Sequence, residues 1–334
     1  MRKLLFITKN RVNTYGHSVG LLNSARLTAE SLNKIGIEAE AISVEDYNRI
    51  DRAIHEHKPG HVIIEALWVI PAKFKELIRL HPKVKWYVCV HSEIPFLANE
   101  GIALEWIYKY LREIDDERLQ IAGNNRRLVR DLNTIGIACA FMPNVYPIHG
   151  VKRIKKRNVY HLDIGSFGAI RPLKNQLIQA MAAISYANKK KKALRFHINA
   201  DRTEQNGQSV LKNIRFLFKN NPEHELVEHP WMTHEAFIEV LRHMDVGLQV
   251  SFSETFNITA ADYVTAGIPV VVSNEINWLP CWTYASTNDM KSIKNAIGRS
   301  LLIRGMSFIN RMFLKHYNRQ MQKAWVKTLK KSEV

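Results

Sequence analysis

The sequence predicts an α/β protein with two domains, each built on a mainly parallel sheet. Two observations carry this prediction. Short apolar runs alternate with segments of helical periodicity, as βαβ units require. The same alternation begins again after a strongly basic stretch at residues 149–158, and 334 residues suffice for two domains.

The first half predicts five buried strands, each a short apolar run: 4–8, 39–43, 61–67, 85–90 and 120–123. Helical patterns fall between them at 21–32, 46–57 and 71–80. Asp46 and Pro71 are typical first residues of helices, and Gly36 is a typical stop signal. We therefore expect a first Rossmann-like domain over residues 1–148.

The second half repeats the pattern, with strands expected at 159–168, 194–200, 224–231, 246–251 and 268–273. Helices are expected at 175–187 and 233–244, the second with Thr233 as its cap. The tail, residues 291–334, has eleven Lys or Arg against one acid and predicts one or two amphipathic helices. We expect a second Rossmann-like domain over 149–313, and we expect a helix at 314–334 to complete the first.

Composition narrows the class of protein. An apolar content of 46% indicates a globular chain. The start, MRKLLFITKN, reads as a strand rather than a signal peptide, and the three cysteines are widely spaced, so we expect reduced thiols and a cytoplasmic location. The net charge of +17 favours a polyanionic partner, although a basic chain can also simply be more soluble.

Two stretches of the second half carry the candidate chemistry. SFSETFNITAADYVTAGIPVVVS (251–273) places carboxylates at Glu254 and Asp262 before a turn into an apolar strand. GSFGAIRPLKN (165–175) places Arg171 and Lys174 after a strand. Carboxylates can accept hydrogen bonds from sugar hydroxyls and paired cations can hold a diphosphate, so together these stretches predict half of a nucleotide-sugar site.

This set of motifs resembles that of the retaining GT4-type glycosyltransferases of the GT-B fold, over nearly the whole chain. The resemblance implies two Rossmann-like domains with parallel sheets facing a central cleft. It implies that Glu254 binds donor sugar hydroxyls and Asp262 the ribose, with backbone N–H groups of Phe256, Asn257 and Ile258 facing sugar and phosphate. Asp262 stands where the family usually has Glu, and Asn257 where it has Gly. The alternative is an exposed helix that happens to carry two acids.

The resemblance also gives the cations a role. Arg171 and Lys174 would stabilise the charge that develops on the leaving diphosphate. The sequence has no Asp-x-Asp pair, which fits a metal-independent site that takes a UDP-sugar as donor and has no prosthetic group. The alternative for these two residues is a solvated loop.

Further site residues follow from the same resemblance. His91 ends a strand where the family often has a histidine near the anomeric carbon, with Glu93 and Asn124 as weaker acceptor-side candidates; a hydrogen-bonded core histidine is the alternative. The expected donor-binding set also includes glycines whose backbone could approach a phosphate and residues beside the nucleotide base or facing the same cleft: Gly16, Gly20, Gly168, Asn199, Trp231 and Met232. A plain strand–helix turn and a core aromatic explain several of these equally well.

The prediction of the acceptor rests on the net charge of the chain. The expected acceptor is double-stranded DNA carrying a hydroxymethylated base, flipped from the stack, as in the phage DNA glucosyltransferases, which this chain resembles in general design; the location would then be the host cytoplasm. The expected contacts are Arg126, Arg127, Arg130, Lys155 and Lys156. One alternative is a peripheral enzyme on an anionic membrane that glycosylates a lipid or polysaccharide. Another is an inactive GT-B module that binds nucleic acid.

Overall fold

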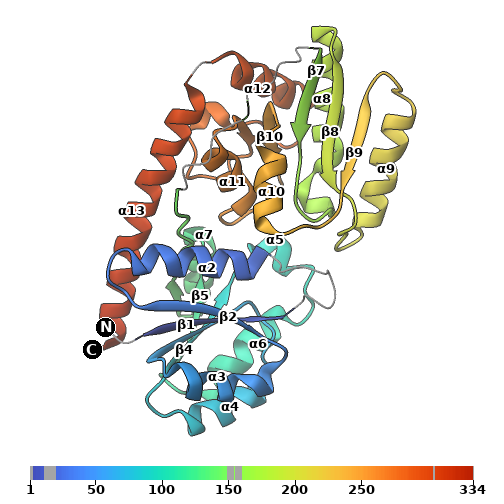
Figure 1. Ribbon diagram of the computed structural model, residues 1–334. Coiled ribbons are helices and arrows are strands. Elements are labelled where there is room, and N and C mark those ends of the chain that lie inside the picture. The colour runs from blue at the N-terminus through green and yellow to red at the C-terminus, as the bar shows by residue number, and fades with distance from the viewer. Residues whose placement is uncertain (1–2, 11–19, 149–153, 155–159, 304, 334) are drawn as a thin grey trace. The chain divides into compact units, whose positions relative to one another are not determined.

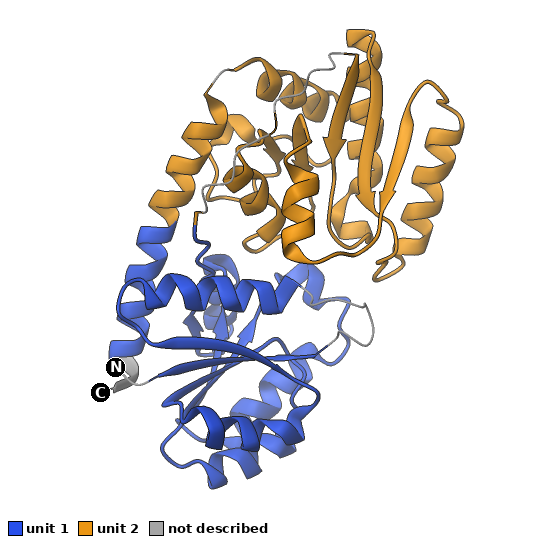
Figure 2. Ribbon diagram, viewed as in Figure 1, with its two compact units in different colours: residues 1–147, 318–334 blue, residues 148–317 orange. Residues whose placement is uncertain are grey.

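The computed structural model describes residues 3–10, 20–148, 154, 160–303 and 305–333. The chain forms two compact units, unit 1 with residues 1–147 and 318–334, and unit 2 with residues 148–317 (Figure 2). Each unit holds one sheet in which every strand pairing is parallel (Figure 1). The α/β prediction is confirmed.

Unit 1 contains a six-stranded sheet in the order β2-β1-β3-β4-β5-β6. Its strands are β1 (Leu4–Lys9), β2 (Ala39–Val44), β3 (His61–Glu65), β4 (Lys85–Val90), β5 (Leu119–Gly123) and β6 (Cys139–Phe141). Its helices are α2 (Gly20–Asn33), η1 (Tyr47–Arg49), α3 (Ile50–His57), α4 (Pro71–Leu80), α5 (Ile94–Leu97), α6 (Ala103–Lys109), η2 (Tyr110–Ile114) and α7 (Arg126–Thr134).

The core of unit 1 forms on both faces of this sheet. Helices α3, α4 and α6 cover one face, where Leu5, Ile64 and Trp86 are fully buried, and α2 lies on the other (Figure 1). The last helix, α13 (Met306–Glu333), returns to this unit. Its Trp325 packs edge-on against Phe6 at 5.7 Å and donates to the Pro143 carbonyl at 2.7 Å. None of the described helices is long and apolar enough to cross a bilayer.

Unit 2 contains a five-stranded sheet in the order β11-β10-β7-β8-β9. Its strands are β7 (His161–Gly165), β8 (Ala193–Asn199), β9 (Glu225–His229), β10 (Val246–Gln249) and β11 (Val270–Val272). Its helices are η3 (Pro172–Lys174), α8 (Gln176–Lys190), α9 (Gly207–Lys219), α10 (His234–Leu241), α11 (Ile258–Ala266), η4 (Cys281–Thr283), α12 (Met290–Leu302) and the first part of α13.

Two glycines let α11 lie close to this sheet. A Cβ on Gly247 would meet the Tyr263 ring at 2.4 Å, and one on Gly165 would meet the Tyr263 hydroxyl at 2.3 Å. That hydroxyl donates to the Gly165 carbonyl at 2.8 Å. Helix α11 therefore packs directly on β7 and β10. Its capping residue Asn257 donates to Gln249, the last residue of β10, so the start of the helix lies at the edge where parallel α/β sheets bind ligands.

Candidate functional site

The candidate donor residues of unit 2 lie in loops that leave the carboxyl ends of its strands. Strand β7 ends at Gly165, earlier than expected, and the chain turns at Gly168, whose φ of +114° suits glycine. The Gly168 N–H donates to the Asn199 side chain at the end of β8, at 3.0 Å. Asn199 in turn donates to the Pro230 carbonyl at 3.3 Å. Asn199 thus ties two strand-end loops together.

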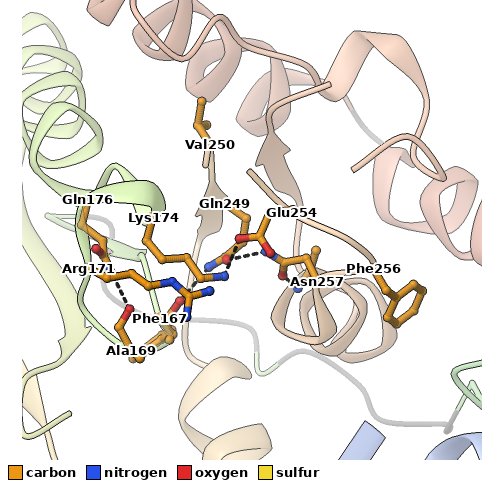
Figure 3. A network of polar contacts seen from close by, with 12 residues as sticks. Phe167, Ala169, Arg171, Lys174, Gln176, Gln249, Val250, Glu254, Phe256 and Asn257 are labelled. Carbon is orange, nitrogen blue, oxygen red and sulfur yellow. Dashed lines mark hydrogen bonds and ion pairs between the residues drawn. The ribbon is translucent and has the colours of Figure 1, made fainter. Parts of the chain in front are cut away.

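Lys174 and Glu254 form a buried ion pair at the centre of the site (Figure 3). They lie 80 positions apart in the sequence, and the Lys174 ammonium donates directly to the Glu254 carboxylate. Burial would raise the pKa of Glu254, but the charges of Lys174 and Arg171 outweigh it and hold the pKa below its usual value. Burial lowers the pKa of Lys174, and the Glu254 charge opposes this shift only in part. The site therefore holds a carboxylate and a cation that a ligand could separate.

Arg171 is oriented by a carboxylate that the sequence analysis missed. Its guanidinium donates to Glu204 at 2.8 Å, and the other oxygen of Glu204 accepts from Arg202 at 2.6 Å. Burial opposes ionisation of Glu204, but the charges of Arg202 and Arg171 lower its pKa. Nothing in the local sequence singles out Glu204, because its role arises only from the loop after β8 lying beside η3.

Amides hold the two site loops in place. The side chain of Asn175, a residue with φ of +60°, donates to the carbonyls of Val250 at 3.1 Å and Thr287 at 2.8 Å. Gln249 donates to the Phe167 carbonyl at 2.9 Å and accepts from Asn257 at 2.9 Å (Figure 3). Side-chain hydrogen bonds from Asn175 and Gln249 therefore hold the loops that carry Lys174 and Glu254 together.

The start of α11 is a capped and tightly packed helix N-terminus. Asn257 caps the helix by accepting from the Ala260 N–H at 2.8 Å, and its φ of +59° lies in the left-handed region that glycine adopts most readily. The Phe256 ring stacks on Trp278 at 5.4 Å and on Tyr317 at 5.5 Å. Ile258 is the first residue of the helix. The helix start is thus rigid and carries the positive end of the helix dipole.

Asp262, the expected ribose ligand, is buried on α11 and has a histidine partner. His234 Nε2 lies 2.8 Å from Asp262 Oδ1. This hydrogen bond is the main cause of the raised pKa of His234, since burial alone would lower it. His234 follows the capping residue Thr233, whose hydroxyl accepts from Ala236 N–H at 3.3 Å as expected. A ligand that binds Asp262 must share it with His234.

The residues expected beside the base lie in the loop after β9. The Trp231 N–H donates to Asp201 at 2.7 Å, and the Arg202 guanidinium stacks on the Trp231 ring at 4.2 Å. Met232 follows and is half-buried. His229 ends β9 and contacts His197 at 2.9 Å.

In unit 1, His91 lies at the carboxyl end of β4 with partners on both ring nitrogens. Its Nε2 contacts the Glu65 carboxylate, and its Nδ1 lies 3.1 Å from the Asn124 side-chain nitrogen. Because an amide N–H can only donate, Nδ1 accepts from Asn124, and the Nε2–H group donates a hydrogen bond to the Glu65 carboxylate. Glu65 was missed, although its position as the last residue of β3 could have identified it.

The arginines expected to contact DNA are engaged within unit 1. Arg127 donates to Glu93 at 3.2 Å, and Arg130 donates to Asp131 at 2.9 Å. The Arg126 guanidinium lies 4.5 Å from the centre of the Phe141 ring. Gly20 begins α2. Gly16, Lys155 and Lys156 lie outside the described residues.

Two groups of side chains in the described part of the chain could hold a metal ion. One is Asp51, His55 and His81, and the other is Glu65, Cys89 and His91. Both groups belong to unit 1, and neither includes Arg171, Lys174 or Glu254.

Comparison with known proteins gives the fold. No family model matches the sequence, and no curated protein does. HepE of Anabaena, solved in complex with UDP, is similar with a TM-score of 0.65 and 11% identity, over 97% of this chain and 100% of that one. The UDP-forming α,α-trehalose-phosphate synthase of Burkholderia vietnamiensis has a TM-score of 0.64 and 10% identity, over 98% and 100%. A glycosyltransferase of Rickettsia africae has a TM-score of 0.65 and 12% identity, over 98% and 97%. The chain therefore has the α/β architecture of the GT-B glycosyltransferases.

Proposed function

We propose that this chain is a retaining glycosyltransferase that moves a sugar, in the first instance glucose, from a UDP-sugar to an acceptor hydroxyl. One observation carries the proposal: Arg171, Lys174 and Glu254 come together at the carboxyl ends of β7 and β10. The similarity to HepE, which was solved with UDP, supports the choice of donor.

The chemistry assigned to these residues follows from their charges. The bond between the anomeric carbon and the diphosphate oxygen breaks, and its electron pair goes to that oxygen. Lys174 and Arg171 stabilise the resulting charge, while Glu254 accepts hydrogen bonds from the sugar hydroxyls. The acceptor oxygen attacks the same face of the sugar and its proton passes to the leaving phosphate. Neither a protein nucleophile nor a metal ion is required by this scheme.

Asp262 and the start of α11 complete the proposed donor site. The Asp262 carboxylate binds the ribose hydroxyls and keeps its hydrogen bond to His234. The N–H groups at the start of α11 face the phosphate or the sugar. Trp231 and Met232 lie beside the base.

Two acceptors are candidates, and the net charge alone favours the first of them, a hydroxymethylated base in double-stranded DNA. The net charge of +17 supports it, because phosphate contacts need only cations. The pairing of Arg127 with Glu93 and of Arg130 with Asp131 weakens the argument from these arginines. The second candidate, a hydroxyl held at an anionic membrane, is favoured by the large exposed apolar side chains of Leu302, Phe308 and Met312.

The test is an incubation with UDP-glucose and related donors, alone and with duplex DNA that carries hydroxymethylated or unmodified bases. UDP release reports on the donor, and mass spectrometry of digested nucleosides reports on the acceptor. We expect Lys174→Met to lower UDP release at least 100-fold, while Lys219→Met, on the exposed end of α9, leaves it unchanged. Wild-type protein that neither binds UDP nor releases it from any donor would refute the proposal.

A further inference from the structure

Unit 2 exposes a cluster of large apolar side chains, here called the apolar cap, formed by Leu302, Ile303, Phe308, Ile309, Met312 and Phe313. Leu302 is 72% exposed, Phe308 67% and Met312 54%. Soluble proteins usually scatter such residues singly, and a contiguous group marks a surface that meets a partner or a membrane.

The apolar cap lies where α12 ends and α13 begins, and it rests on a packed base. Phe308 and Met312 are one helical turn apart, as are Ile309 and Phe313, so each pair shares a face of α13. The opposite side of α13 is buried through Met306, Asn310 and Leu314. The Phe313 ring also meets Trp282 edge-on at 5.7 Å. The cap is therefore part of the fold and not a loose tail.

The surroundings of the apolar cap are cationic. No acidic residue occurs from Lys291 to Ser332. Arg299 in the last turn of α12 and Lys315 on α13 are exposed. Large apolar side chains beside Lys and Arg, without acids, are typical of a surface that lies on an anionic bilayer. DNA would need the cations but not the apolar residues, and a second copy of this chain would bring like charges together.

We propose that the apolar cap docks on an anionic phospholipid bilayer. Phe308 and Met312 enter the boundary between headgroups and acyl chains, and Lys315 contacts headgroup phosphates. The docking itself does not depend on catalysis. The consequence for the acceptor rests on the proposed function: the sugar would go to a hydroxyl that is held at the membrane surface, on a lipid or a lipid-linked polymer.

The test is co-sedimentation of the full chain with vesicles of phosphatidylcholine alone or with 30% phosphatidylserine, at about 0.1 M salt. We expect binding only to the anionic vesicles. The double variant Phe308→Ser with Met312→Ser should bind at least tenfold more weakly. Phe216→Ser is the matched control, since Phe216 is 66% exposed on α9 in the same unit, and it should bind as the wild type does.

Three results would overturn the docking proposal. The first is that the wild type does not bind anionic vesicles, and the second is that the double variant binds them as well as the wild type does. The third is a concentration-dependent dimer in sedimentation velocity that the double substitution abolishes and that vesicles do not disrupt. UDP release without vesicles is measured in parallel and should be equal in wild type and double variant. Vesicle binding without UDP release would refute the proposed function alone, whereas UDP release without vesicle binding would refute the docking alone.

Discussion

At the scale of single residues, Lys174 and Glu254 are two buried charges that compensate each other as an ion pair. Removing one partner leaves the other charge buried and uncompensated. We expect Lys174→Met alone to lower the free energy of unfolding by about 3 kcal/mol, and Lys174→Met with Glu254→Gln to lower it by less. Urea denaturation measures both. Glu30→Gln, which breaks the exposed pair with Lys34, is the control and should cost at most about 0.5 kcal/mol. A double variant less stable than either single variant would contradict this account.

His229 gives a prediction about pH. Burial and, to a lesser degree, the neighbouring His197 lower its pKa to about 4, from about 6.5 in the unfolded chain. Between these values the unfolded state binds more protons, so stability falls as the pH falls from 6.5 to 4. The His229→Gln variant should lose about 1 to 2 kcal/mol less free energy of unfolding than the wild type over this pH range. The figure is reduced from the full pKa shift because the ring is partly exposed to solvent. Urea denaturation at pH 7 and pH 4 measures it, with the exposed His55→Gln as control. If the free energy of unfolding depended on pH equally in variant and wild type, His229 would be protonated as easily in the folded state as in the unfolded state.

At the scale of elements, α11 lies on the sheet because Gly165 and Gly247 leave room for Tyr263. A methyl group on Gly247 must displace a ring that is fully buried. We expect Gly247→Ala to destabilise unit 2 by about 3 kcal/mol, measured by thermal or urea unfolding. Gly101→Ala adds a methyl group with nothing within 4 Å and should change stability by at most about 0.5 kcal/mol. An unaffected Gly247→Ala protein would mean that the helix can shift away at little cost.

The sequence predicted elements best where its local signals agree with the tertiary packing. The runs 85–90 and 71–80 match β4 and α4 residue for residue, because a strand that is apolar from its second residue on and a proline at the helix start leave little choice. Helix α9 was not predicted, since Asn206 precedes it in the left-handed region and supplies no side-chain cap. The tail helix begins at Met306, earlier than the expected residue 314. Exposed Phe308 and Met312 break the amphipathic pattern there, so periodicity alone could not mark the true start.

The sequence predicted single residues of the candidate site, but it did not predict which of these residues contact one another. Glu254 and Lys174 were identified from their motifs, but a pair 80 positions apart becomes a contact only through the strand order of the sheet. Glu204 and His234 carry no local signal, because a polar residue in a loop gains a role only from what folds against it. Whether these residues bind a nucleotide sugar stays a prediction.

At the scale of the whole molecule, two separate cores predict two unfolding transitions. One core surrounds Trp86 in unit 1 and the other surrounds Phe196 in unit 2. We expect Trp325→Ala to lower the free energy of unfolding of unit 1 by about 4 kcal/mol and therefore to lower the transition temperature of that unit. Gly247→Ala should lower the transition temperature of unit 2 instead. Differential scanning calorimetry resolves them, with the exposed Lys327→Ala as control. A single transition that moves in both variants would show that the units unfold together.

The return of α13 to unit 1 has a consequence for synthesis on the ribosome. The sheet of unit 1 leaves the exit tunnel first, but Trp325 and Leu329, which cover part of it, come only after residues 148–317. At roughly 5 to 20 residues per second this delay lasts roughly 10 to 35 s. During that time the nascent chain presents the Phe6 side of its first sheet without its cover, so chaperone binding should concentrate on nascent chains of this length and end when the last helix is released.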